Sequence, residues 1–227
     1  MNSCKNLPNP KKLGGFKMID KKVYLFDWDG CLADTLSIWL AGYYKVFNEF
    51  GLHPSDLEIA KIFGDWKGPE KLGISDTQGF ITKLLTEVQP KLSDVKLNPN
   101  AKEVLTELKK RNKKIAVLTS SKKEDVYPRL EKYNLLSLID CFLAMEDVIK
   151  HKPDPEVINK ATEILKADKN GAIIIGDGDK DIVCGQNAGI TTVLYYPLTN
   201  SKFYKEEDLK KLNADYLIRD FLELATL

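Results

Sequence analysis

The sequence predicts an α/β protein with a doubly wound parallel sheet of the Rossmann-like type and an inserted α-helical segment. Two observations lead to this prediction. In the second half of the chain, short apolar runs alternate with segments of helical periodicity, which is typical of buried parallel strands joined by crossover helices. The first apolar run, in contrast, is followed by several helical patterns with no strand between them, which is longer than one crossover requires.

Length and composition limit the function classes that fit this chain. The 227 residues, 43% of them apolar, are enough for one large or two unequal domains. Because 34 basic residues nearly balance 33 acidic ones, no extended surface for nucleic acid or for an anionic membrane is expected. No apolar run has the length of a signal peptide core or a membrane span. We therefore expect a monomer or small homo-oligomer that acts on a small molecule.

The first predicted strand, over residues 23–26, runs directly into two acidic residues. Asp27 and Asp29 follow it with one residue between them, and Gly30 comes next. In open α/β sheets ligands bind at the carboxyl ends of the strands. Two carboxylates there can share a divalent cation while one of them attacks a substrate or moves protons. Taken alone, the pattern also fits an ordinary turn that closes a strand.

A helical insertion follows. A helix over 36–50 carries apolar residues at spacings of three, four and seven; Asp34 or Thr35 is placed to cap its start, and Gly51 to end it. A short helix over 57–63, a loop over 64–69 and a helix over 78–88 come next. The predicted organisation has three parts. Residues 1–20 form a flexible lead-in, residues 21–35 and 98–227 form a core domain, and residues 36–97 form a helical cap domain.

Regular alternation begins beyond residue 98 and predicts the rest of the sheet. The helices are expected over residues 101–111, 123–133, 155–165 and 181–188. The strands are expected over residues 114–118, 141–145, 172–175 and 191–195, with a further edge strand near 216–218.

Polar residues follow each of the first four predicted strands of the core. Besides the two aspartates of the first strand, they are Thr119-Ser120-Ser121, Lys152 in the loop after the third strand, and Asp177 with Asp181 after the fourth. Acids gathered at one edge repel one another unless a cation neutralises them, and ligands that are all oxygen suit Mg²⁺. The two histidines and four cysteines have no zinc-type spacing, so the cysteines are interpreted as reduced thiols of a cytoplasmic protein.

These four ordered motifs resemble the haloacid dehalogenase-like superfamily, specifically its phosphatases with a helical cap after the first strand. The resemblance covers residues 21–226 and implies Mg²⁺-dependent hydrolysis of a small phosphate monoester through an aspartyl-phosphate. By this resemblance Asp27 is the nucleophile and Asp29 the general acid and base. Cys31 departs from the pattern, because threonine is common there, and this puts one loop hydrogen bond in doubt.

The resemblance also implies the binding residues. It predicts that Thr119 and Ser120 bind the phosphoryl group and that Lys152 pairs with both the phosphate and the nucleophile. The Mg²⁺ ligands it implies are Asp27, Asp29, Asp177 and Asp181. In the cap, the aromatic residues of the 36–50 helix are expected to form a core, which leaves Trp66 and Lys67 as the candidates for substrate specificity.

Two other functions are weighed against the phosphatase. A receiver-type signalling module also gathers acids, a hydroxyl and a lysine around Mg²⁺, but its lysine follows the fifth strand and it lacks a long insertion. A phosphosugar mutase of the β-phosphoglucomutase type has a histidine at the position of Trp39, so hydrolysis is favoured. Which phosphate ester is the substrate does not follow from the sequence.

Overall fold

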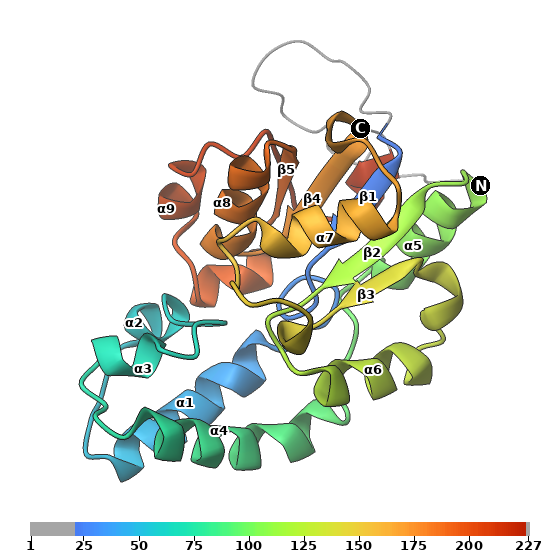
Figure 1. Ribbon diagram of the computed structural model, residues 1–227. Coiled ribbons are helices and arrows are strands. Elements are labelled where there is room, and N and C mark those ends of the chain that lie inside the picture. Colours follow the sequence, from blue (N-terminus) through green and yellow to red (C-terminus); the bar gives the residue numbers. More distant parts are fainter. Residues whose placement is uncertain (1–20, 226–227) are drawn as a thin grey trace, which may run out of the picture.

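A six-stranded, all-parallel sheet forms the centre of the computed structural model, which describes residues 21–225 (Figure 1). The strand order is β3-β2-β1-β4-β5-β6, so the predicted doubly wound fold class is confirmed. The strands are β1 (Val23–Phe26), β2 (Lys114–Leu118), β3 (Cys141–Leu143), β4 (Ala172–Gly176), β5 (Thr191–Tyr195) and β6 (Tyr216–Ile218). The lead-in predicted for residues 1–20 lies outside the described residues.

Helices cover both faces of the sheet because alternate strand residues point to opposite sides. Side chains such as Phe26 and Val117 pack on one face against α5 (Ala101–Lys110) and α6 (Lys123–Lys132). On the other face Leu25 and Ile174 pack against α7 (Glu156–Ile164) and α8 (Asp179–Ala188). The strands are buried on both sides, which explains why they are apolar without alternation.

Four helices lie between β1 and α5 and form a separate lobe beside the sheet (Figure 1). They are α1 (Leu36–Glu49), α2 (Asp56–Ala60), α3 (Gly68–Lys71) and α4 (Thr77–Leu92), and we call this lobe the insertion. Their apolar residues, including Tyr43, Phe47 and Phe80, form a hydrophobic cluster of their own. The expected aromatic core is present, whereas the exact boundary between cap and core domains stays a prediction.

Several boundaries differ from the expected ones. The predicted 57–63 helix ends early, at Ala60, and the predicted 64–69 loop runs into α3, whose first turn contains Pro69. Helix α4 begins one residue early, where Asp76 accepts a hydrogen bond from the Gly79 amide at 2.9 Å, and it continues through Pro90. Strand β3 is shorter than expected because a 3-10 helix, Met145–Asp147, follows it.

The sheet register brings the strand ends into line. Phe26 pairs with Val117 on one side and with Ile175 on the other, and the Asp27 amide donates to the Ile175 carbonyl at 2.9 Å. The residues that follow β1, β2 and β4 therefore meet at one edge. Within residues 21–225, none of the helices combines the length and the apolar character needed to cross a membrane.

Candidate active site

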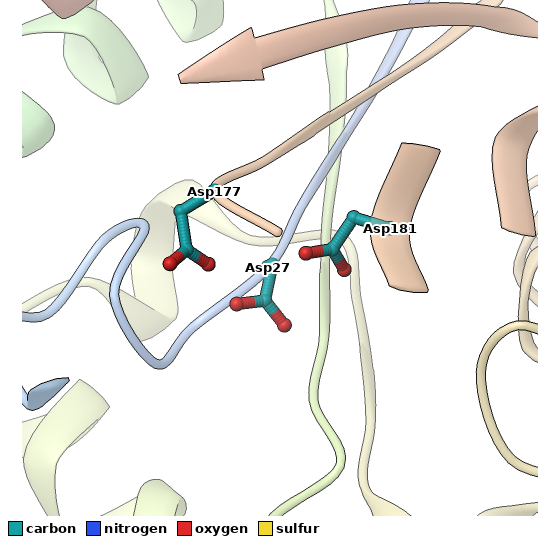
Figure 2. A group of neighbouring side chains, drawn as sticks. All are labelled: Asp27, Asp177 and Asp181. Carbon is teal, nitrogen blue, oxygen red and sulfur yellow. The ribbon is translucent and has the colours of Figure 1, made fainter. Parts of the chain in front are cut away.

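Three aspartates meet at the carboxyl edge of the sheet (Figure 2). Asp27 follows β1, Asp177 follows β4 and Asp181 lies in the first turn of α8. Each offers a carboxylate oxygen within 4.8 Å of those of the other two, and all three residues are buried. The structure thus brings together three of the four acids that the sequence predicted as metal ligands.

Two glycines make this close approach possible. Gly30 has φ +76°, and a Cβ atom there would lie 2.4 Å from Asp177 Oδ2. A Cβ on Gly176, the last residue of β4, would lie 2.3 Å from the Cβ of Asp181. Only glycine avoids both the left-handed strain at Gly30 and these overlaps, so the two positions are fixed by the packing of the acids.

Lys152 is the cation of the cluster. Its ammonium donates to Asp27 Oδ1 and Asp181 Oδ1, each at 2.7 Å, and to the Leu118 carbonyl at 2.8 Å. Burial acts to lower its pKa, but the two carboxylates, Asp181 first, outweigh burial and raise the pKa. An ammonium has three N–H donors, and all three are used here. Lys152 is therefore held rigidly in its charged form between two acids.

One lysine does not neutralise three buried carboxylates. Burial, and then the nearby Asp181, raise the pKa of Asp27 to about 8. Burial, and then the charges of Asp27 and Asp181, raise the pKa of Asp177 well above its usual range. Asp177 Oδ2 is also buried without a hydrogen-bond donor among the described residues. An unsatisfied buried oxygen in a set of carboxylates fits a hard divalent cation such as Mg²⁺.

Asp29 stands apart from this group. Its Oδ1 accepts a hydrogen bond from the Trp39 indole at 3.0 Å, and its Oδ2 accepts one from the Ser121 hydroxyl at 2.7 Å. The Thr119 hydroxyl lies 3.5 Å from the same Oδ2. The structure therefore does not bring the Asp29 side chain to the other three acids, because donors on the far side hold it. These two donors fix the orientation of the Asp29 carboxylate, which lines the cavity beside Asp27.

The residues predicted to bind substrate do not all lie in the same place. Ser120 and Trp66 line a common cavity, and the Trp66 indole donates to the Ser120 carbonyl at 3.1 Å. Thr119 is buried behind them, with its hydroxyl accepting from the Ser121 amide at 3.0 Å. Lys67 is exposed and does not line the cavity, and its backbone amide donates to Asp65 Oδ1 at 3.0 Å.

The cavity lies between the sheet edge and the insertion and has a volume of about 80 Å³. Asp27, Asp29 and Lys152 line its floor, and aromatic residues of the insertion line its other side. Pockets for drug-sized ligands have volumes of about 300 Å³ or more, so this one suits a small substrate.

Sequence reasoning missed several residues of this cavity, among them Trp39, Ser121, Lys180 and Tyr204. Ser121 and Lys180 stand inside motifs that the sequence did single out, so their proximity in the chain was the available signal. Trp39 was expected to be a core aromatic and does belong to the hydrophobic cluster of the insertion, but it also lines the cavity. Tyr204 follows a 3-10 helix after β5, where no pattern pointed to the site.

Buried acids, a paired lysine and hydroxyl groups at the carboxyl edge of a doubly wound sheet are typical of enzymes that transfer phosphoryl groups. The chain belongs to the haloacid dehalogenase-like hydrolase family, which matches residues 24–195. This agrees with the resemblance carried by the four motifs and sets aside the receiver module.

Individual relatives cover nearly the whole chain. A protein of Caldanaerobacter subterraneus, provisionally named pyrophosphatase PpaX, is 31% identical over 88% of this chain and 91% of its own length. Pyrophosphatase PpaX of Oceanobacillus iheyensis is 27% identical over 91% of this chain and 96% of its own. Among solved structures, a haloacid dehalogenase-like hydrolase of Bacteroides fragilis, also provisionally named, has a TM-score of 0.80 at 25% identity, covering 90% and 99% of the two chains.

Proposed function

We propose that this hydrolase is a Mg²⁺-dependent phosphatase that forms an aspartyl-phosphate on Asp27. The observation that carries the proposal is the setting of the Asp27 carboxylate. It lines the cavity, Lys152 holds its Oδ1 at 2.7 Å, and its Oδ2 has no hydrogen-bond donor among the described residues. A carboxylate oriented through one oxygen presents the other to a substrate as a nucleophile.

Asp27, Asp177 and Asp181 are the side chains that would hold Mg²⁺, because they are the buried acids that lie together. The bound cation would supply positive charge that neutralises these acids and the phosphoryl oxygens.

The residues of the chain then have defined roles in two steps. Asp27 attacks phosphorus and the bond to the leaving oxygen breaks, while Asp29 gives that oxygen a proton. In the second step Asp29 takes a proton from water, whose oxygen attacks phosphorus and releases Asp27. Lys152 acts against burial by favouring the ionised form of Asp27, and it holds that carboxylate in place. The Trp39 and Ser121 donors orient Asp29.

The cavity supports a small phosphorylated metabolite as the substrate, either a phosphate monoester or inorganic pyrophosphate. Its volume of about 80 Å³ supports the small size. Inorganic pyrophosphate is included as a candidate because relatives of this chain are named pyrophosphatases. Hydrolysis is favoured over a mutase reaction because Trp39, which occupies the position facing Asp29, has an indole that donates a hydrogen bond and has no basic nitrogen.

A phosphate-release assay tests the proposal. Wild-type protein is given a panel of small phosphate esters and pyrophosphate, with Mg²⁺ and with a chelator in excess. We expect turnover that requires the cation and that falls by several orders of magnitude in Asp27→Asn, a change that keeps the size of the side chain. Turnover that survives chelation or the Asp27→Asn change would show that another mechanism operates.

A further inference from the structure

Lys180 is a second lysine of the cavity, and its surroundings differ from those of Lys152. It lies in the first turn of α8, directly before Asp181, and it lines the cavity together with Asp27. Its ammonium donates one hydrogen bond, to the Phe63 carbonyl of the insertion. Within residues 21–225 it has no ion-pair partner within 4.0 Å, and two of its three N–H donors have no acceptor.

The position of Lys180 is costly without an anionic partner. The side chain is half-buried, and a lysine withdrawn from water usually pairs with a carboxylate or a bound anion. The charges of Asp179, Asp65 and Asp181 favour the protonated form of Lys180, but none of these carboxylates lies within 4.0 Å of its ammonium, and Asp181 already accepts a hydrogen bond from Lys152. The donors of Lys152 are all used within the protein, so Lys180 is the lysine of this cavity that has N–H groups left for a ligand.

A second uncommitted donor lies in the same cavity. The Tyr204 side chain also lines it, and its hydroxyl oxygen lies near Gly178, 3.8 Å from where a Cβ of that residue would be. No acceptor for this hydroxyl is found in the described part of the chain. Phe203 packs against Phe63 with ring centroids 6.4 Å apart, which holds the Tyr204 segment against the insertion near the carbonyl that Lys180 binds.

We propose that Lys180 and the Tyr204 hydroxyl bind a second anionic group of the substrate, next to the phosphoryl group that is transferred. The preferred substrates then carry a further phosphate or carboxylate close to the scissile bond, as inorganic pyrophosphate and 2-phosphoglycolate do. This inference rests on the proposed phosphatase function and adds the residues that select among small phosphates. It moves the predicted role in specificity from Lys67 to a lysine that lines the cavity.

A matched pair of substrates tests the inference. 2-Phosphoglycolate and ethyl phosphate have similar sizes, but only the former has a second anionic group; pyrophosphate tests a phosphate in place of the carboxylate. We expect the wild-type kcat/KM for pyrophosphate or 2-phosphoglycolate to exceed that for ethyl phosphate by about tenfold or more, as one charge-assisted contact allows. The compound with the higher kcat/KM, pyrophosphate or 2-phosphoglycolate, then shows whether the second anionic group is a phosphate or a carboxylate.

The variants separate recognition from packing. Lys180→Met keeps the apolar stem and should remove most of the preference, about tenfold, chiefly through KM, while the loss on p-nitrophenyl phosphate, which has no second anionic group, should be clearly smaller. Tyr204→Phe should act in the same direction by about threefold, as loss of one neutral hydrogen bond does. Lys61→Met, at an exposed lysine at the end of α2, is the control. It should change neither the substrate preference nor the turnover of p-nitrophenyl phosphate.

Three outcomes would overturn the inference. They are a wild-type enzyme without the preference, a Lys180→Met variant that retains it, and equal losses on all substrates, which would mean that Lys180 only joins α8 to the insertion. In each case p-nitrophenyl phosphate turnover that depends on Asp27 leaves the proposed function standing. An enzyme that hydrolyses none of these compounds would overturn both.

Discussion

Gly30, in the loop after β1, leaves the space that the Asp177 carboxylate occupies in the acid cluster. Its φ of +76° disfavours any other residue, and a Cβ there would overlap Asp177 Oδ2. Gly51, at the end of α1, has a similar φ of +72° but open space where a Cβ would be, so it is a matched control.

We expect Gly51→Ala to lower the free energy of unfolding by about 1 kcal/mol, the cost of the left-handed conformation alone. Gly30→Ala should cost more than this and should weaken Mg²⁺ binding, because the new methyl group displaces the Asp177 carboxylate. Urea unfolding with and without Mg²⁺ measures both effects. Equal losses in the two variants, with Mg²⁺ binding intact, would show that the overlap is relieved without moving Asp177.

The hydrogen bond from Trp39 to Asp29 makes a second prediction at this scale. Trp39→Phe keeps an aromatic ring in the insertion but removes the donor that orients Asp29, so kcat should fall by about tenfold while KM changes little. Trp66→Phe loses a similar bond, but to the Ser120 carbonyl, and should affect kcat less. Steady-state kinetics on one good substrate gives both numbers. If the Trp66 variant lost as much kcat as the Trp39 variant, orientation of Asp29 would not explain either effect.

Some of these residues could be predicted from the sequence and others could not. Asp27, Lys152 and Asp177 follow strands whose order along one sheet edge is set by topology, so the motifs alone bring them together. The positions of Trp39 and Lys180 depend on how the insertion packs over that edge. No local pattern encodes that packing, which is why the cavity-lining position of Trp39, a member of the insertion's core, and that of Lys180 did not follow from the sequence.

Among the elements, the contact between α1 and α4 is the clearest case of packing that outweighs local propensity. Gly42 lies in the middle of α1, where glycine is about 1 kcal/mol less favourable than alanine. A Cβ on Gly42 would lie 2.3 Å from Val88 Cγ2 and 3.1 Å from Leu84 Cδ1 of α4. The two helices therefore approach closely because this position has no side chain.

Gly42→Ala distinguishes the two effects by sign. Propensity alone would stabilise the protein, whereas overpacking of α1 against α4 should lower the free energy of unfolding by about 1–3 kcal/mol. Ala41→Gly, at the exposed neighbouring position, measures the propensity without the contact. Denaturant unfolding of both variants is sufficient, and a Gly42→Ala protein more stable than wild type would contradict the close approach of the helices.

Periodicity predicted the long elements well and the short ones poorly. Strands β1, β2 and β5 have the expected bounds because continuous apolar runs mark strands buried on both faces. Helix α3 and the 3-10 helix after β3 were missed, since a single turn is too short to show a period. The start of α8 was placed two residues late because its first turn is acidic and contacts the cavity.

Across the whole molecule, the buried acids couple stability to both pH and Mg²⁺. In the metal-free folded protein the pKa of Asp27 is about 8, well above the value of about 4 for an unfolded chain. Between these two pH values the folded state therefore holds a proton on Asp27 that the unfolded state has lost. Without Mg²⁺, stability should fall as pH rises from about 4 to about 8.

Mg²⁺ should reverse this trend, because it binds the ionised acids and displaces their protons. At a saturating concentration we expect Mg²⁺ to raise Tm by about 5–10 °C at pH 8 and by clearly less at pH 6. Thermal unfolding at both pH values checks this, with Asp177→Asn as the variant in which most of the gain is lost. A Tm increase that is independent of pH would mean that the cation binds elsewhere.

Formation of a phosphoenzyme on Asp27 is the central claim, and mass spectrometry of the acid-quenched enzyme tests it directly. The Asp29→Asn variant should accumulate the intermediate from p-nitrophenyl phosphate, because this leaving group needs little protonation while the second step still lacks its base. We predict that the peptide carrying Asp27 gains the mass of one phosphoryl group, and that the gain disappears when Asp27 is also changed to Asn. Sustained turnover by the wild type, with no phosphoryl group on this peptide in either protein, would contradict the account.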